Sequence, residues 1–219
     1  ALNPVFTIGE QLVETIRFHD KLDKHSAREK AVQLLEKTRI PYPSERLSSY
    51  PHQLSGGMNQ RVMIALALAA KPKLLIADEP TTALDVLTQN QIIELLAEFA
   101  VQKEFAILFI THDISLIESI ADTILVLYAG EIIEILTGDD LKSGRMRHPC
   151  TKALKECLPK LTTKPLSSHL YTIQGQIAQN SREFDNRCIF SDRCEKLLPI
   201  CTKEKPKLVD KVKCFIYNQ

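Results

Sequence analysis

The chain has 219 residues, 44% of them apolar and 25% charged, and its formal net charge is +1. This composition predicts a packed core rather than disorder, and the near-neutral charge and lack of Trp argue against nucleic-acid binding. The longest apolar run, residues 62–70, is much shorter than the roughly 18 residues of a membrane-spanning helix. The first residues lack the basic and apolar regions of a secretory signal, so we expect a cytosolic protein.

Residues 1–53 are predicted to be helical, with loops between the helices. Ser26 and Glu29 have the spacing of a capping box, and apolar residues at helical spacing follow them. The stretch 40–51 is rich in Pro and Ser, which predicts an irregular connection.

Residues 54–138 alternate between predicted helices and short apolar strands. This alternation is typical of an α/β fold with a parallel sheet, whose strands are buried on both faces. We therefore expect the strands to be buried. The predicted helices span residues 62–70 and 87–101, and the predicted strands span residues 73–77, 106–110 and 123–127.

Residues 139–219 are rich in loops and contain all six cysteines. Short helices are predicted around Leu141 and over residues 151–158. Cys150 and Cys157 lie near or on the second of these helices, and we expect both to be packing residues. The other four cysteines cluster in residues 188–219, which indicates a metal, an iron–sulfur cluster, redox chemistry or no ligand at all, because disulfides require an oxidising compartment.

Two short motifs are candidates for phosphate and metal binding. Ser55, Gly56 and Gly57 precede a predicted helix, where glycines and unpaired helix amides can form an anion site. Asp78 and Glu79 end a predicted strand, at the edge where α/β sheets bind ligands. An Asp suits Mg²⁺ coordination and a Glu suits a base or water-positioning role. Each motif also has an ordinary structural interpretation, as a loop before a helix and as solvated carboxylates.

His112 follows the next predicted strand. A histidine at the carboxyl end of a strand can contact a phosphate oxygen, although a single histidine is more often structural. The residues TTALD, 81–85, lie between these sites and by themselves indicate only the start of a helix.

The order of these motifs resembles that of ABC-type ATPases. LSGGMNQR, KLLIADEP, ALD and TH follow one another as in the second half of an ABC nucleotide-binding domain. The resemblance implies a partial P-loop NTPase-type α/β domain with a helical subdomain, and it implies ATP and Mg²⁺ as cofactors. The implied roles are catalysis by Glu79 and His112, Mg²⁺ binding by Asp78, a D-loop at Asp85, and a signature motif that contacts ATP in trans at Leu54, Ser55, Gly56, Gly57, Met58, Asn59 and Gln60.

The remaining motifs resemble the peptide- and nickel-importer branch of that family. YAGEIIE and HPCTKAL match this branch, with Cys150 where Tyr is usual, and residues 139–219 then form its small Cys-rich C-terminal extension. Some members hold a 4Fe–4S cluster in such a tail, which implies Cys188, Cys194, Cys201 and Cys214 as ligands. Unligated thiols, zinc and disulfides remain alternatives, and the wide cysteine spacing supports zinc poorly.

No P-loop, GxxxxGK(S/T), occurs among the 219 residues. We therefore expect a fragment, a split gene product or a truncated remnant, with negligible ATP hydrolysis and poor stability in isolation.

The resemblance implies an ATP-hydrolysing subunit that energises import of oligo- or dipeptides, with nickel as an alternative substrate. Its implied partners are a second ABC ATPase subunit, two integral membrane permease subunits and, through them, an extracytoplasmic substrate-binding protein. The implied location is the cytoplasmic face of the cell membrane. The alternative function is a non-catalytic remnant or regulatory module that contributes only its signature motif in trans. An ABC protein of DNA repair or translation is disfavoured, because the sequence shows neither long heptads nor a second nucleotide-binding domain beside the signature.

Overall fold

The computed structural model describes residues 1–82, 84–102, 105–158, 172–175, 184 and 186–217. The chain divides into two compact units, Ala1–His112 and Asp113–Gln219, which are described separately below. The helical residues 1–53 and the strands of residues 74–78 and 106–110 all belong to the first unit. The three-part division predicted from composition stays a prediction.

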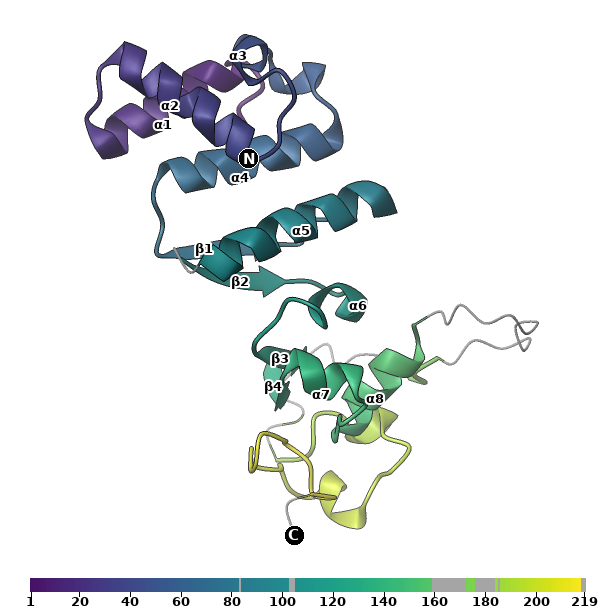
Figure 1. The fold of residues 1–219 in the computed structure, drawn as a ribbon. Helices are drawn as coiled ribbons and strands as arrows, with labels where there is room; N and C mark the ends of the chain where they lie inside the picture. The colour runs from purple at the N-terminus through teal and green to yellow at the C-terminus, as the bar shows by residue number, and fades with distance from the viewer. Residues whose placement is uncertain (83, 103–104, 159–171, 176–183, 185, 218–219) are drawn as a thin grey trace, which may run out of the picture. The chain divides into compact units, whose positions relative to one another are not determined.

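The amino-terminal part of the first unit is a small helical bundle (Figure 1). Three helices contribute its core, which includes the fully buried side chains of Leu12, Leu35 and Val62. Apolar residues at helical spacing supply the buried faces, as expected for helices stabilised mainly by packing. The elements are α1 (Ile8–Asp20), α2 (Lys24–Lys37), α3 (Pro43–Arg46), the 3₁₀ helix η1 (Pro51–Gln53) and α4 (Gly56–Ala69).

Helix α2 begins earlier than the sequence predicted. Asp23 is its N-cap and its side chain accepts hydrogen bonds from the backbone N–H groups of His25 and Ser26, at 2.8 and 3.1 Å. The predicted capping box at Ser26 is therefore wrong. An Asp three residues upstream caps the helix first, and the Ser26 hydroxyl donates to Asp23 at 2.6 Å.

The α/β part of the first unit consists of β1 (Leu74–Asp78), α5 (Val86–Gln102) and β2 (Ala106–Ile110). The two strands are parallel and in register from Leu74 opposite Ala106 to Asp78 opposite Ile110. Helix α5 packs its apolar side, including Leu96, on one face of this sheet. The predicted α/β class and these two strands are confirmed.

The opposite face of the β1–β2 sheet is exposed, so the expectation of fully buried strands is wrong. Leu74 and Ile76 are 50% and 59% exposed, and Leu108 and Ile110 are 45% and 44% exposed. Parallel strands are normally covered on both faces. Here α5 covers one face only.

The second unit begins with a helical turn and a β-hairpin. The third predicted strand exists, but it pairs antiparallel with a strand that the sequence analysis missed. Ala129 and Gly130 form the tight turn with φ of 46° and 84°, and a positive φ at both positions is typical of two-residue hairpins. The elements are α6 (Ile114–Ile117), β3 (Ile124–Tyr128) and β4 (Glu131–Leu136).

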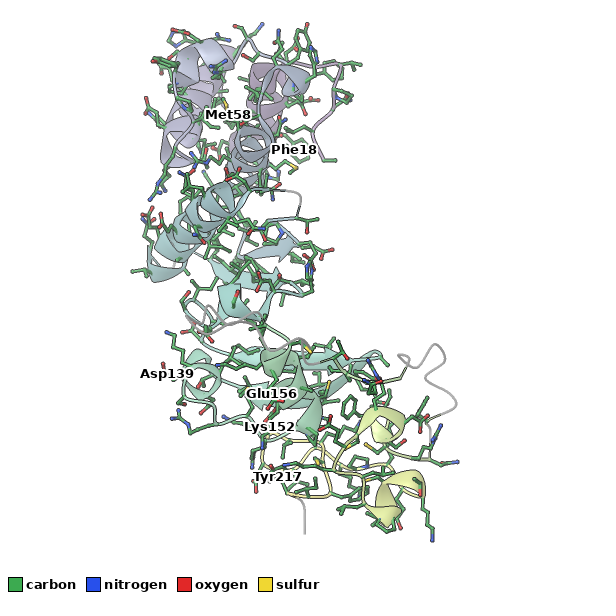
Figure 2. The ribbon with its side chains drawn as sticks, turned by 90° about the vertical axis from the view of Figure 1, so that its right-hand side faces the viewer. Phe18, Met58, Asp139, Lys152, Glu156 and Tyr217 are labelled. Carbon is green, nitrogen blue, oxygen red and sulfur yellow. The ribbon has the colours of Figure 1, made fainter. Side chains whose placement is uncertain are left out.

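In the described part of the second unit, four short helices and the C-terminal segment accompany this hairpin. The C-terminal segment runs beside β4, since the Ile135 N–H donates to the Lys211 carbonyl and the Lys213 N–H donates to the Ile133 carbonyl, both at 2.8 Å. Lys152 Nζ donates to the Tyr217 hydroxyl at 3.1 Å, and both residues are labelled in Figure 2. The helices are α7 (Gly138–Lys142), α8 (Pro149–Glu156), η3 (Ser191–Arg193) and η4 (Pro199–Thr202).

Candidate functional site

Parallel strands β1 and β2 bring two predicted site residues into contact. Glu79 follows β1 directly, and its N–H donates to the Ile110 carbonyl of β2 at 2.9 Å. Its Oε1 accepts a hydrogen bond from the His112 backbone N–H at 3.1 Å and lies 2.8 Å from His112 Nδ1. Residues 33 positions apart in the chain therefore meet because both strands end at the same edge of the sheet.

The Glu79 carboxylate is held in a fixed position. Its backbone φ is +46°, a conformation that costs of order 1–3 kcal/mol for a residue other than glycine and that clusters at functional sites. Thr82 Oγ1 donates to Oε2 at 3.0 Å. The hydrogen bond with His112 is the main cause that lowers the pKa of Glu79. An ionised carboxylate only accepts, so Nδ1 of His112 carries a proton in this contact.

Asp78 is the last residue of β1 and is exposed beside Glu79. It therefore stands at the carboxyl end of the sheet, where an oxygen ligand can meet a phosphate-bound Mg²⁺. The chemistry of this side chain fits that cation.

The predicted signature residues form the start of α4. Ser55 is the N-cap, and its hydroxyl accepts a hydrogen bond from the Met58 N–H at 3.3 Å. Ser55 and Gly56 are exposed, so the first turn of α4 presents its amides at the surface. Unpaired N–H groups and the helix dipole favour an anion at such a helix end.

The start of α4 packs directly against the start of α5. A Cβ added to Gly57 would lie 2.3 Å from Thr88 Cγ2, so only glycine fits there without movement. Thr88 in turn donates its N–H and its hydroxyl to Asp85, at 2.9 and 2.8 Å. Gly57 of the predicted signature motif and Asp85 of the predicted D-loop are thus joined through Thr88. Ala83 of that loop lies outside the described residues.

Three residues of this neighbourhood were missed by the sequence analysis. Thr82 holds Glu79, Thr88 joins α4 to Asp85, and Arg61 holds α4 in place. The Arg61 guanidinium donates to the Arg39 carbonyl at 2.8 Å and to Gln91 Oε1 of α5 at 2.6 Å. No spacing rule singles out these contacts, because each depends on how α4 and α5 pack.

The four tail cysteines lie in one cluster of the second unit. Cys188, Cys201 and Cys214 are buried, Cys194 is partly buried, and all are free thiols. The Cys188 N–H donates to the Cys201 carbonyl at 2.9 Å. Burial is the main cause that raises the pKa of Cys188 to about 11, and the charges of Cys201, Cys194 and Cys214 raise it further. Cys188 therefore lies in the same part of the second unit as the other three cysteines that the sequence analysis grouped.

The chemistry of this donor set is compatible with an iron–sulfur cluster, which takes four cysteine thiolates. Within the described ranges, no three His, Cys, Asp or Glu side chains gather closely enough to hold a single metal ion. A buried Oε2 of Glu134 has no hydrogen-bond partner, and its carboxylate is close enough to Cys214 to raise the pKa of that thiol.

The segment before α8 has its own buried polar group. His148 is 2% exposed and caps α8, since its Nδ1 accepts from the Cys150 N–H at 3.1 Å. Burial lowers the pKa of His148 to about 4, against the opposing effect of a backbone hydrogen bond with Lys213. Cys150 is buried but Cys157 is exposed at the end of α8, so the expected packing role of Cys157 is wrong.

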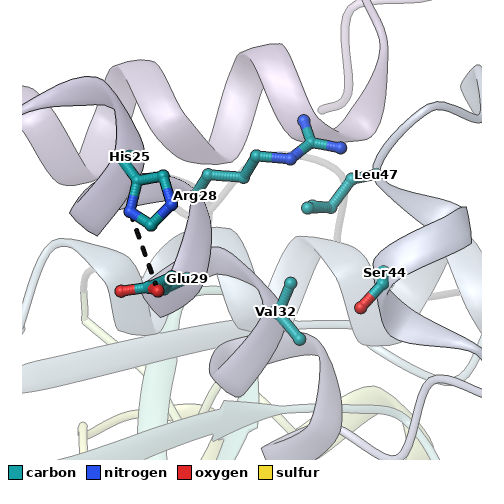
Figure 3. Close-up of a pocket in the computed structure, with 6 residues that line it drawn as sticks. All are labelled: His25, Arg28, Glu29, Val32, Ser44 and Leu47. Atoms are coloured by element: carbon teal, nitrogen blue, oxygen red, sulfur yellow. Dashed lines mark ion pairs between the residues drawn. The ribbon is translucent and has the colours of Figure 1, made fainter.

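A hollow in the helical bundle contains none of the predicted site residues (Figure 3). An ion pair between His25 and Glu29, one turn apart on α2, lies at its rim. Its lining consists of His25, Arg28, Glu29, Val32, Ser44 and Leu47.

Comparisons with known proteins agree on one protein family. The model of the ABC transporter family matches residues 1–82, and the model of the oligopeptide/dipeptide transporter C-terminal region matches residues 133–201. The oligopeptide transport ATP-binding protein AppD of Bacillus subtilis is 40% identical over an alignment of 224 residues. The alignment covers 100% of this chain and 67% of AppD. The chain belongs to the ABC transporter ATP-binding family.

Other members of the family confirm the α/β ATPase fold. The dipeptide transport ATP-binding protein DppD of Escherichia coli is 44% identical over 209 residues, which cover 95% of this chain. This chain spans only 62% of the length of DppD. Among solved structures, the ATP-binding cassette MJ0796, bound to ADP and Pi, is 30% identical with a TM-score of 0.55, over 62% of this chain and 58% of that one. None of the helices in the described part of the chain is both long and apolar enough to cross a membrane.

Proposed function

We propose that the chain is part of an ATP-hydrolysing subunit that energises an importer of oligo- or dipeptides. The observation that carries this proposal is the contact between Glu79 and His112 at the carboxyl edge of the β1–β2 sheet. The names of AppD and DppD support peptides over nickel as the cargo.

Each residue at the edge of the sheet has a proposed role in hydrolysis. Asp78 binds Mg²⁺, which supplies charge neutralisation beside the phosphates when it is bound. Glu79 orients the attacking water and accepts its proton, for which the lowered pKa keeps the carboxylate ionised. His112 fixes Glu79 through Nδ1.

The signature residues act on a nucleotide held by a second ATPase subunit. Ser55, Gly56 and Gly57 present the amide end of α4 to its phosphates, and Asp85 lies beside them through Thr88. The proposed signature motif comprises residues 54–60. The remaining proposed partners are two membrane permease subunits and, through them, a substrate-binding protein, which places this subunit at the cytoplasmic face of the membrane.

The tail cysteines Cys188, Cys194, Cys201 and Cys214 are the proposed ligands of a 4Fe–4S cluster. Support comes from their common cluster and from the number and kind of donors. When bound, such a group would supply covalent cross-links between the segments that carry these cysteines.

The test is the Mg²⁺-dependent ATPase rate of the native polypeptide, captured with its partners by an antibody to residues 180–219. Glu79→Gln and His112→Ala are expected to lower turnover at least about 100-fold, since general-base groups contribute typically 10²–10⁴-fold. Glu36→Gln, an exposed change on α2, is the matched control and is expected to leave the rate unchanged. Equal rates for Glu79→Gln and the unaltered protein would refute the assignment.

The 219-residue chain alone has no P-loop and is expected to hydrolyse ATP no faster than its Glu79→Gln variant. A higher rate in contaminant-free protein would show that the residues named here suffice without a P-loop.

A further inference from the structure

The turn that follows β1 places a threonine hydroxyl on the Glu79 carboxylate. The Thr82 N–H donates to the Glu79 carbonyl at 3.2 Å, so residues 79–82 form a tight turn. Pro80 is the second residue of this turn, where the fixed φ of proline is favoured. The turn brings Thr82 back to the residue at which it starts, and Thr82 Oγ1 donates to Glu79 Oε2 at 3.0 Å.

The backbone of this turn is anchored on both sides, although the Thr82 side chain is exposed. Thr81 is buried, and the side-chain amide of Gln89 on α5 donates to the Thr81 carbonyl at 3.1 Å. On the other side, the Glu79 N–H donates to the Ile110 carbonyl of β2 at 2.9 Å. The Thr82 hydroxyl is therefore presented from a backbone that α5 and β2 hold in place.

The two oxygens of the Glu79 carboxylate have different numbers of partners. Oε1 accepts from the His112 backbone N–H at 3.1 Å and lies 2.8 Å from His112 Nδ1. A carboxylate oxygen has two lone pairs, so these two contacts fill Oε1. Among the described residues only Thr82 donates to Oε2, which leaves one lone pair of that oxygen for a further donor. The Glu79 side chain is 35% exposed, so a water molecule can reach this position.

We propose that Thr82 is a positioning residue for hydrolysis, whose hydroxyl turns the Glu79 carboxylate so that Oε2 accepts the proton of the attacking water. This inference rests on the proposed role of Glu79 as the base. In that step the water gives a proton to Oε2 as its oxygen bonds to the terminal phosphorus of ATP. The bond from that phosphorus to the oxygen of ADP breaks, and its electron pair stays on ADP. A base must lie within hydrogen-bond reach of the proton it takes, so a carboxylate that rotates out of this orientation is a poorer base.

The experiment measures kcat and KM for Mg²⁺-dependent ATP hydrolysis by the native subunit captured with its partners. Thr82→Val keeps the shape of the side chain but removes the hydroxyl. It is expected to lower kcat at least about 10-fold with KM unchanged, since a small misplacement at the reacting centre can cost about 10²-fold in rate. Thr82→Ser keeps a hydroxyl and is expected to retain most of the rate. Thr15→Val is the matched control, because it removes a hydroxyl that donates within α1 to the Gln11 carbonyl, and it should leave kcat unchanged.

A double variant shows whether Thr82 acts through Glu79. Thr82→Val added to Glu79→Gln should be no slower than Glu79→Gln alone, because the carboxylate that Thr82 orients is already absent. A second readout needs no nucleotide and uses the 219-residue chain labelled with ¹³C at its glutamate carboxyl carbons. The Glu79 resonance, assigned by its loss in Glu79→Gln, is expected to shift in Thr82→Val and to shift much less in Thr82→Ser.

Three outcomes would overturn the role of Thr82 while leaving Glu79 as the base. Thr82→Val could hydrolyse ATP as fast as the unaltered subunit, it could slow Glu79→Gln as strongly as it slows the unaltered subunit, or it could leave the Glu79 resonance in place. In each case Glu79→Gln alone would still be slow. If instead Glu79→Gln hydrolyses ATP at the full rate, the base assignment itself is wrong and the role of Thr82 falls with it.

Discussion

Two sets of ionisable groups, one in each unit, have their pKa values shifted by opposite physical causes. In the first unit, Glu79 and Asp85 lie near the surface, and hydrogen bonds lower the pKa of each. In the second unit, His148, Cys150 and Cys188 are buried, and desolvation is the largest cause of each pKa shift.

This difference predicts which substitutions affect activity and which conditions affect stability. A carboxylate held by hydrogen bonds at the surface stays ionised and reachable by water, so replacing it should affect chemistry more than folding. A buried titratable group must stay neutral, because an uncompensated charge in an apolar cluster is expensive. The first unit should therefore respond to substitution by losing activity, and the second should respond to pH by losing stability.

The largest stability effect is expected for His148 on acidification. Its pKa is lowered from 6.5 to about 4 on folding, so the unfolded chain binds more protons than the folded chain between these values. Stability is therefore full above pH 6.5 and falls as the pH drops towards 4, by about 3 kcal/mol. Protonation would also put a proton on Nδ1, which accepts from the Cys150 N–H. Hydrogen exchange of β3 and β4 between pH 7 and 4.5, corrected for intrinsic rates, measures the loss.

His148→Asn is the matched variant for this prediction. Asn keeps an oxygen that can cap α8 but does not titrate in this range. Its second unit should show a much flatter dependence between pH 6.5 and 4.5. The same slope in both proteins would mean that another group causes the loss.

The second-largest loss of stability is expected where the start of α4 packs against the start of α5. Gly57→Ala would place a methyl group 2.3 Å from Thr88 Cγ2 and force Thr88 to turn away from Asp85. The expected cost is about 2 kcal/mol, in the range of overpacked sites. Hydrogen exchange of α4 and α5 peptides in the full chain would record it.

A second substitution separates this clash from other effects of alanine. Thr88→Ser removes Cγ2 but keeps the hydroxyl that donates to Asp85, so Gly57→Ala with Thr88→Ser should recover most of the loss. Gly56→Ala is the control at the adjacent position, since its Cβ would lie 3.4 Å from Leu84 Cδ2. An equal loss for Gly56→Ala would place the cause in the helix start rather than at Thr88.

Elements whose structure is determined by the local sequence pattern could be predicted from the sequence. Residues 106–110 were predicted as a strand and form β2, and the meeting of Glu79 with His112 follows from parallel strands that end together. The exposed face of Ile76 was not predictable, because an apolar side chain does not reveal whether another segment covers it. Strand β4 was missed because its two glutamates obscure the apolar pattern of residues 131–136.

The cysteines of the second unit show that contacts between residues far apart in the sequence are equally hard to predict. Its four tail positions were grouped through a family resemblance, whereas the place of Cys150 beside them depends on how α8 packs on the hairpin. Spacing along the chain contains no information on that packing. For Arg61, likewise, the partner Gln91 is 30 residues away on another helix.

The smallest effect tests the start of α2, which the sequence analysis misplaced. Asp23→Ala removes the acceptor for two backbone N–H groups of α2 and should cost about 1 kcal/mol, as lost N-caps do. Ser26→Ala removes only a hydroxyl that donates to Asp23, so its cost should be a few tenths of that. Hydrogen exchange of the first turn of α2 distinguishes the two variants. If Ser26→Ala opened this turn more than Asp23→Ala, the helix would begin at the originally predicted capping box, and the two carboxylate contacts of Asp23 would carry little of its stability.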